Sequence, residues 1–556
     1  MAAVDTLRDA LYGNPPSASF KPSRDGVLAA FEELIATMSS GGAGVASLAA
    51  LAALPISNLT AVLTEIGKQG SWIRALSASY SSLLSSDTLH GISIVSSVDT
   101  TYCWLRIWDG VTPKAEWFGA KLNNGAFDSY AACQACLDVT GILIFPRGGS
   151  YYGSRGLLLP DNAVVRGQGS LFTGYTCSHA TDHLMRQRGV SGVSYAAGAD
   201  LQDFALVRTP NPTTPGSSAN DNSQGHGLHF FMVSNPRVRS VYTYNNLAEV
   251  YVSNCLSPDI TDIRGIRQTG TSADRWYGLW VDGVTGGGTF GGPSPNPSAT
   301  FKKPSMVSLA AVGTCYHYYL KGALQDLWIV DPEAAGQGVV SVQFFLDIQG
   351  AAGGDVHIIS PIADGYKTNA INVKGAPFGS SIIIENAWVA PNSAATSTGV
   401  VIDASHGVKL SGRSNFAAAT GLACVTANDC TGLVCDFQSN NSQTPFSGTS
   451  INSCNIQISA FKNIAGGGGT FGNVITLIGG SRNRAIALAT ISPNSSPQLW
   501  VAGVALNNTA ANCLIDVTGI ANGAATNRVS IAGSGVSTQG NVSGHVIINP
   551  GAGAML

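Results

Sequence analysis

Three short apolar segments each hold one ring side chain between two aliphatic or aromatic neighbours. They read Leu228-His229-Phe230, Val250-Tyr251-Val252 and Leu279-Trp280-Val281, and the first two are 22 residues apart. If these segments are strands stacked in register, His229, Tyr251 and Trp280 form one outward column. Stacked rings on a flat sheet can hold sugar rings through CH–π contact and apolar burial. The alternative is that the same rings pack under a loop or at a subunit interface.

A second candidate column pairs a tyrosine with an arginine at the same spacing. Tyr242 is followed 22 residues later by Arg264. A guanidinium at this place could pair with an acidic sugar or with a nearby aspartate. We therefore include Tyr242 and Arg264 among the expected substrate-binding residues.

Carboxylates that could act as acid, base or nucleophile are scarce in this chain. Glycoside hydrolysis needs two carboxyl groups, about 5–5.5 Å apart for retention and about 6.5–9.5 Å apart for inversion. We take Glu249, Asp262 and Asp282 as the catalytic candidates, with Glu249 and Asp282 predicted to point outward like their ring neighbours. Glu249 and Asp282 would lie more than about 13 Å apart within one chain, so they could pair only between subunits.

Asp262 belongs to a recurring corner, which gives it a second interpretation. Four segments share an apolar-x-(Asp/Ser)-apolar pattern, in which an aspartate can cap a turn through side-chain-to-backbone hydrogen bonds. We favour turn-capping for most of these aspartates and keep Asp262 because it lies beside the Tyr242/Arg264 column. The four segments are Leu201-Gln202-Asp203-Phe204, Val238-Arg239-Ser240-Val241, Ile260-Thr261-Asp262-Ile263 and Leu324-Gln325-Asp326-Leu327.

A lyase reaction is the other chemistry that the residues allow. It would remove a proton beside a uronic-acid carboxylate, with a histidine or tyrosine as base and an arginine neutralising the carboxylate. The set that could supply these groups is His226, His229, Tyr242 and Arg264.

The elements that must position these side chains are short strands with a repeat of a little over twenty residues. One strand per face in each repeat is typical of a β-solenoid, whose stacked rungs satisfy one another's backbone groups. Alternation then places six apolar side chains in the interior: Leu228, Phe230, Val250, Val252, Leu279 and Val281. Irregular stretches at 208–226, 267–277 and 283–305 are rich in Pro, Gly, Ser, Asn and Thr, which predicts loops that leave the coil.

Composition supports this architecture and excludes several classes of protein. The chain has 556 residues with 66 glycines, and only 11% of its residues are charged, which suits many short strands and turns. A net charge of −3 gives no basic surface for nucleic acid, and no apolar run reaches the about 18 residues of a membrane span.

The cysteines give no sign of a disulfide framework or a metal centre. There are eleven, and the close pair Cys133 and Cys136 lacks two further ligands at zinc-site spacing. We therefore expect buried thiols in a reducing compartment, no metal and no cofactor. The N-terminus has neither a basic region nor an apolar stretch of the signal-peptide type.

One stretch of sequence carries a family resemblance. Residues 115–170 read AEWFGAKLNNGAFDSYAACQACLDVTGILIFPRGGSYYGSRGLLLPDNAVVRGQGS, and residues 90–110 before them read HGISIVSSVDTTYCWLRIWDG. A Trp-Phe-Gly-Ala turn, a short helix, a strand ending in Phe-Pro and a strand closing on Arg-Gly-Gln-Gly follow in that order. The stretch resembles the start of the right-handed parallel β-helix in bacteriophage tailspikes and other pectate-lyase-like proteins, with the similarity covering about residues 69–170.

The resemblance implies an organisation along the chain. We expect an N-terminal arm and helix at 1–47 for virion attachment or a stem, with Ser23 capping an amphipathic helix over 24–38. A small β module at 48–114 precedes a parallel β-helix at 115–464 with glycan-binding loops. Residues 465–556 are expected to form further coils or a trimerising β domain.

The resemblance also implies a function and an assembly. It predicts an all-β homotrimer on the phage tail, made in the host cytoplasm, that binds bacterial O-antigen, capsule or exopolysaccharide and cleaves it. Association into a trimer would also cover the exposed flanks of so weakly charged a solenoid. A glycoside hydrolase is favoured over a lyase, and the alternatives are a non-enzymatic adhesin and a purely structural fibre. Nucleic acid and membrane insertion are not expected.

Overall fold

The computed structural model describes most of the chain from Ala43 onward. The described residues are 43–169, 173–190, 194–209, 225–271, 274–283, 298–310, 312–336, 340–348, 354–392, 398–462, 471–491, 500–507, 510, 513–517, 520, 525–532 and 546–548. The helix predicted over 24–38, and the whole N-terminal arm up to residue 42, lie outside them. The chain divides into two units, residues 1–144 and residues 145–556.

The first unit contains a five-stranded sheet and several short helices. Its strands are ordered β1-β2-β3-β5-β4, parallel between β1 and β2 and antiparallel elsewhere. Trp72 and Trp104 fill the core of this sheet. The elements are β1 (Ala43–Val45), α3 (Leu48–Ala52), β2 (Thr60–Leu63), β3 (Gly70–Leu76), η1 (Ser77–Tyr80), α4 (Ser81–Ser86), β4 (Ser93–Val95), β5 (Tyr102–Arg106), η2 (Ala115–Phe118), α5 (Tyr130–Thr140) and β6 (Ile142–Ile144). Among the described residues, none of the helices has the length and apolar content that a membrane crossing requires.

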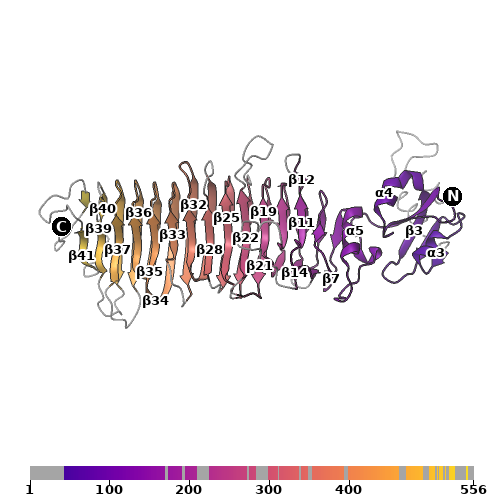
Figure 1. The fold of residues 1–556 in the computed structure, drawn as a ribbon, viewed down its shortest axis with the longest axis horizontal. Coiled ribbons are helices and arrows are strands. Elements are labelled where there is room, and N and C mark those ends of the chain that lie inside the picture. Colours follow the sequence, from indigo (N-terminus) through magenta and orange to yellow (C-terminus); the bar gives the residue numbers. More distant parts are fainter. Residues whose placement is uncertain are drawn as a thin grey trace, which may run out of the picture. The chain divides into compact units, whose positions relative to one another are not determined.

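The second unit is a parallel β-helix built from three long sheets, which we name sheets I, II and III. Figure 1 shows the strands following one another as a regular stack. Each strand pairs in parallel with the equivalent strand one rung earlier and one rung later, as in β15–β19–β22–β25. The structure confirms the predicted all-β fold and its stacked rungs.

Sheet I carries the predicted ring residues. Its strands are β8 (Leu157–Leu158), β11 (Met185–Arg188), β15 (Leu228–Phe231), β19 (Ala248–Ser253), β22 (Arg275–Gly283), β25 (Thr314–Gly322), β28 (Val340–Asp347), β31 (Asn369–Lys374), β33 (Val400–Asp403), the last parts of β34 (Val408–Asn428) and β35 (Val434–Thr449), β37 (Phe471–Ile478), β39 (Trp500–Asn507) and β41 (Ala525–Ala532).

Sheet II follows sheet I in each rung. Its strands are β9 (Val164–Arg166), β13 (Asp200–Gln202), β17 (Arg237–Arg239), β20 (Asp259–Thr261), β23 (Thr300–Lys302), β26 (Leu327–Val330), β29 (Asp355–Ile359), the first parts of β32 (Ser381–Pro391), β34 and β35, β36 (Asn455–Lys462), β38 (Arg484–Ile491), β40 (Leu514–Asp516) and β42 (Val546–Ile548). A two-stranded pair, β12 (Ala196–Ala197) and β16 (Val233–Ser234), lies outside the three long sheets.

Sheet III completes each rung. Its strands are β7 (Ser150–Gly153), β10 (Gly174–Cys177), β14 (Ala205–Arg208), β18 (Tyr242–Tyr244), β21 (Arg264–Arg267), β24 (Ser305–Ser308), β27 (Glu333–Gly336), β30 (Ile362–Tyr366) and the later parts of β32 and the middle parts of β34 and β35. Two of the predicted loops are too long, because β22 begins at Arg275 within 267–277 and β23 lies within 283–305. Most of the predicted loop 208–226, and residues 284–297 of the third loop, lie outside the described residues.

The interior is an apolar ladder, as alternation predicts. All six predicted interior side chains are at most 1% exposed, and Leu228, Val250 and Leu279 occupy equivalent positions on successive rungs. Tyr318 and Phe344 continue that column with parallel stacked rings 4.5 Å apart. Each rung therefore buries its own apolar strand face against the rungs on either side.

The predicted corner pattern marks a real bend between sheets II and III, with one correction. Asp203, Ser240 and Asp262 all adopt left-handed backbone with φ between 50° and 61°, and each N–H donates to the next rung. Asp and Asn tolerate this conformation better than most residues, which explains the pattern. Asp326 is also left-handed, but it directly precedes β26 and lies at the other corner, between sheets I and II. Its sequence neighbourhood resembles the first three because both bends place a left-handed residue between two apolar ones.

Candidate functional site

The predicted ring column exists, and it is longer than the sequence suggested. His229 pairs with Tyr251 and Tyr251 with Trp280 on sheet I, and the column continues through Tyr319 and Phe345. We call these five residues the ring strip. Periodicity missed its last two members because the rung from Trp280 to Tyr319 spans 39 positions (319 − 280).

Neighbouring rings of the strip touch along its whole length. The ring centroids of His229 and Tyr251 are 5.0 Å apart, those of Tyr251 and Trp280 are 5.2 Å apart, and those of Trp280 and Tyr319 are 5.3 Å apart. Tyr319 and Phe345 are stacked with an interplanar angle of 2°. Such contacts are favourable beyond simple burial, so the strip is a rigid surface.

Two further tyrosines widen the strip on one side. Tyr277 lies 4.6 Å from Trp280 and 5.4 Å from Tyr319, measured between ring centroids. Tyr316 stacks on both Tyr319 and Phe345, with 5.2 Å between the ring centroids in each pair. The C-terminal end of the ring strip is therefore two rings wide.

Exposure divides the strip into two ends. His229, Tyr251 and Trp280 are 5%, 1% and 5% exposed, so they do not form the open platform that the sequence predicted. Tyr316, Tyr319 and Phe345 are partly exposed. The rings that a ligand can reach therefore lie one to two rungs further along the coil than the predicted column.

A ladder of alternating charge runs parallel to the ring strip on the same strands. The paired residues on five successive rungs are Asp282, Lys321, Asp347, Lys374 and Asp403. The first three lie two residues after Trp280, Tyr319 and Phe345. Because residues two apart share a strand face, this charge ladder faces the same way as the ring strip. Of its members, the sequence singled out Asp282 alone.

Asp282 connects the ladder to the strip. Its carboxylate accepts a hydrogen bond from the Tyr251 hydroxyl at 3.3 Å, and the residue is 9% exposed. Burial raises the pKa of the Asp282 carboxyl, although the charge of Lys321 and the Tyr251 hydrogen bond act in the opposite direction. A carboxyl with a raised pKa is suited to give up a proton at near-neutral pH.

Glu249 does not point outward, and this prediction was wrong. Its side chain is fully buried, and its carboxylate accepts hydrogen bonds from Asn246 and from Trp276 Nε1 at 3.0 Å. A Cβ built on Gly265, which lies between the fully buried Thr243 and Met306 in sheet III, would fall 2.8 Å from Glu249 Cβ. The strand breaks its alternation here, so Glu249 and Val250 both face the interior.

The buried position gives Glu249 a structural role. Burial raises the pKa of its carboxyl, and the hydrogen bonds from Asn246 and Trp276 partly offset the effect. Asn246 also accepts from Arg208 Nε at 3.2 Å, so a polar network crosses the interior at this level. A group with this burial cannot contact a polysaccharide on the outer surface.

Tyr242, Arg264 and Asp262 lie on and beside sheet III, not on sheet I. The predicted register of Tyr242 with Arg264 is observed, and the guanidinium lies 5.4 Å from the centre of the Tyr242 ring. Asp262 accepts a hydrogen bond from the Ser240 hydroxyl one rung earlier at 2.9 Å, which is a side-chain contact between two corners and not the predicted side-chain-to-backbone cap. The lyase set is accordingly split, with His226 and His229 at sheet I and Tyr242 and Arg264 on sheet III.

Sequence reasoning also missed a pocket of about 430 Å³ beside the β12–β16 pair. It is lined by Asp161, Tyr195, Asp200 and Arg237 among others. The Asp161 carboxylate accepts a hydrogen bond from Ala197 N at 3.1 Å, so this side chain stabilises the backbone of β12. None of its lining residues belongs to the ring strip.

Comparison with known proteins gives no relative by sequence. No protein-family model matches the chain, and no curated protein matches it at a significant level. Comparison of structures, in contrast, finds many similar folds.

Bacteriophage tailspikes are prominent among these similar structures. The tailspike protein of E. coli bacteriophage HK620, solved in complex with a pentasaccharide, has a TM-score of 0.54 at 10% identity, covering 84% of this chain and 86% of its own. Tailspike protein 3 of bacteriophage CBA120 has a TM-score of 0.44 at 15% identity, covering 85% of this chain and 68% of its own. The chain therefore has the parallel β-helix fold of phage tailspikes, as the sequence resemblance predicts.

Proposed function

We propose that this protein is a phage tailspike that binds a bacterial surface polysaccharide along the partly exposed C-terminal end of the ring strip and hydrolyses it. The observation that carries the proposal is the coincidence, on one face of sheet I, of partly exposed rings with a ladder of carboxylates. Rings hold sugars through their apolar faces, and carboxylates supply the acid and base of glycoside hydrolysis. The HK620 tailspike, which shares the fold, was solved with a pentasaccharide bound.

Asp282 and Asp347 are the pair that we assign to the reaction. They are two rungs apart in one column, with Lys321 between them. At about 4.8 Å per rung their backbones are about 9.6 Å apart, and the proposal requires the two carboxyl groups to lean slightly toward each other. Carboxyl groups about 6.5–9.5 Å apart leave room for a water molecule and give inversion at the anomeric carbon.

The two carboxyl groups then have different tasks. Asp282, whose pKa is raised by burial, protonates the oxygen of the leaving sugar as general acid. Asp347 takes a proton from the attacking water as general base. Tyr316, Tyr319 and Phe345 hold the sugars beside the scissile bond.

The test is an assay of polysaccharide from the host surface with the purified full chain. The expected result is release of short oligosaccharides with new reducing ends, and NMR of the first product should show inverted anomeric configuration. Binding without release would instead identify a non-enzymatic adhesin. New ultraviolet absorbance from a conjugated double bond would identify a lyase and refute hydrolysis.

The proposed assembly is a homotrimer joined to the phage tail through residues 1–47, made in the host cytoplasm. A solenoid with 11% charged residues has long flanks that self-association would cover. Sedimentation equilibrium on the full chain should give three times the mass of 57.2 kDa. A monomer at micromolar concentration would contradict this part of the proposal.

A further inference from the structure

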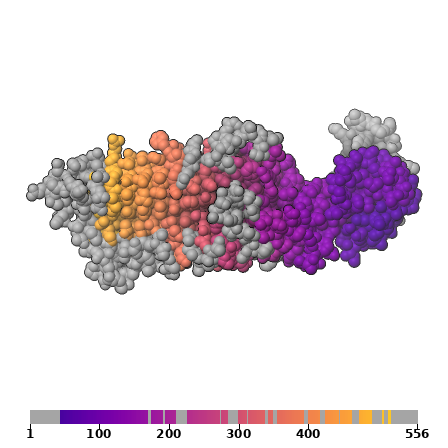
Figure 2. Space-filling model, in the orientation of Figure 1, coloured from indigo at the N-terminus to yellow at the C-terminus, as the bar shows by residue number. Residues whose placement is uncertain are grey.

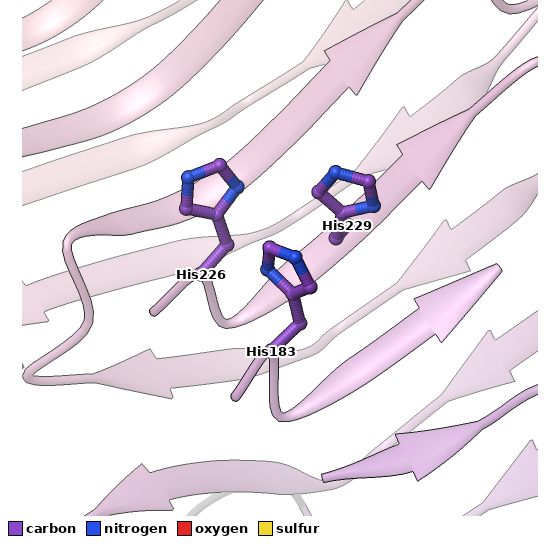
Figure 3. Close-up of side chains that lie close together, drawn as sticks. All are labelled: His183, His226 and His229. Atoms are coloured by element: carbon purple, nitrogen blue, oxygen red, sulfur yellow. The ribbon is translucent and has the colours of Figure 1, made fainter. Parts of the chain in front are cut away.

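Three histidines gather at the N-terminal end of the ring strip, on two adjacent rungs. His183 lies just before β11, His226 lies just before β15, and His229 is the second residue of β15. Figure 3 shows the three rings grouped together above these turns. One ring nitrogen of each lies within 4.8 Å of a ring nitrogen of the other two.

We propose that His183, His226 and His229 bind one divalent transition-metal ion, with zinc as the best fit. Three imidazole nitrogens are the donor set of many zinc sites, and imidazole also suits copper, nickel and cobalt. With metal–nitrogen distances of about 2.0–2.1 Å, nitrogens around a tetrahedral ion lie about 3.3 Å apart.

Burial and hydrogen bonding indicate that the rings are suited to a ligand. The three residues are 8%, 0% and 5% exposed, in the order of the sequence. Among the described residues, His183 Nδ1 and His229 Nδ1 are buried without a hydrogen-bond partner. A buried polar atom with no partner is costly, and a metal ion would satisfy it.

The protonation state also fits. Burial, reinforced by the neighbouring histidines and by Arg186, lowers the pKa of His183 and of His229 below the ordinary value of a histidine. Burial therefore favours the neutral form of these two rings, which is the form that binds metals.

The backbone around the rings is fixed by contacts between rungs. Leu184 N donates to His226 O at 2.8 Å, which places His183 directly beside His226 on the next rung. Gly227 separates His226 from Leu228, and a Cβ there would lie 2.6 Å from Glu249 O, so no larger residue fits without movement. Rigid backbone of this kind is what a preorganised metal site requires.

Arg208 positions the two turns that carry the histidines. Its buried guanidinium donates to the carbonyl oxygen of Asp182 at 2.6 Å and to that of His226 at 3.4 Å. The cations that act on the rings are Arg186 and Arg208 at His183, and Arg186 and Arg188 at His229. The Arg208 charge is directed toward carbonyl oxygens, which limits its repulsion of a metal ion.

The sequence did not suggest this site, and it predicted no metal at all. His226-x-x-His229 is a recognisable pair, but His183 is 43 positions before His226 (226 − 183) and joins it only because the rungs stack. The inferred role is a clamp between the rungs of β11 and β15. It is independent of polysaccharide cleavage.

The experiment is zinc binding by the full chain without an affinity tag, after treatment with a chelator. Equilibrium dialysis against ZnCl₂ should show one zinc per chain, and thermal unfolding should move to higher temperature as zinc is added. CoCl₂ should give the visible absorption of tetrahedral cobalt. No uptake of either metal by the parent protein would overturn the proposal.

Variants locate the ion. His183→Gln, His226→Gln and His229→Gln should each weaken zinc binding by at least about tenfold and lose the cobalt absorption. His179→Gln, four residues from His183 and 39% exposed, is the matched control and should bind as the parent does. Circular dichroism in chelator confirms that each variant is folded. Equal binding by the three variants and the control would mean surface binding only and would refute the site.

Discussion

The two ends of the ring strip carry aromatic rings at equivalent strand positions but differ in how far those rings are exposed. At the N-terminal end His229, Tyr251 and Trp280 are buried and pack against one another, whereas at the C-terminal end Tyr319 and Phe345 are partly exposed. Both ends belong to one column with one register. The comparison teaches that an outward position on a β-helix is not by itself an accessible one. Figure 2 shows the described rungs of the second unit as a continuous body.

The largest expected effect is on the rate of polysaccharide cleavage, through Asp282, which lies where the buried end of the strip meets the exposed end. Asp282→Asn should lower the rate of cleavage by about 10²–10⁴-fold, because an amide cannot donate the acid proton. Binding of the polysaccharide, measured by surface plasmon resonance, should stay within a factor of about three, since the side chain keeps its shape. Asp403→Asn, in the same charge ladder but three rungs beyond Lys321, is the control and should cleave normally. An unchanged rate in Asp282→Asn would remove this residue from the reaction.

The next effect is a difference between the two ends in how much a ring contributes to the free energy of unfolding. Trp280→Ala should destabilise the fold by about 3–5 kcal/mol, because a large buried ring is replaced by a cavity among Tyr251, Tyr277 and Tyr319. Denaturant unfolding of the variant and parent measures the difference. Tyr319→Ala, at a partly exposed place, should cost less. Equal losses would mean that the two ends are equally buried in solution.

The third effect concerns binding. Tyr319→Ala should weaken polysaccharide affinity about fivefold through loss of about 1 kcal/mol of ring contact, while the fold persists. Trp328→Ala is the control, because Trp328 is 37% exposed on sheet II, where it stacks on His357. Isothermal titration with an oligosaccharide distinguishes them. If Trp328→Ala were the more damaging change, the binding face would be sheet II and not the ring strip.

The smallest effect is on the pH dependence of cleavage. The general acid must be protonated, so the rate should fall as pH rises through the pKa of Asp282, which burial holds above its ordinary value. Lys321→Met removes the charge that most opposes this shift, so the falling limb should move to higher pH and the rate there should increase several-fold. Lys374→Met, the next lysine in the ladder, pairs with Asp347 and not with Asp282, so it should leave the falling limb unchanged.

Asp282 also contributes to the pH dependence of stability, and the direction of that contribution is defined. Because the folded pKa of Asp282 is raised, its contribution is present in full below the unfolded pKa and is lost as pH rises through the folded pKa. Asp282→Asn should therefore reduce the loss of stability on raising the pH above about 4, the ordinary value of an aspartate. Thermal unfolding at a series of pH values would check this, and a parallel decline in both proteins would contradict it.

Sequence by itself determined the rungs and the interior. Alternation and a repeat of about two dozen residues suffice to place Leu228, Val250 and Leu279 inside and to align His229 with Tyr251 and Trp280, because strand pairing is a local rule repeated at each rung. The corner aspartates follow from the same logic, since a left-handed bend selects Asp, Asn or Ser. These features depend on short segments and their neighbours one rung away.

Tertiary structure alone decided what is accessible and what comes together across unequal rungs. A break in alternation turned Glu249 inward, which no pattern of residue types announces because its neighbour Val250 keeps its predicted place. Rungs of unequal length hid the alignment of Trp280 with Tyr319 and of His183 with His226. The physical reason is that contacts between side chains depend on how many residues each loop adds between strands, and loop length is not constrained by the strand register that the sequence pattern reveals.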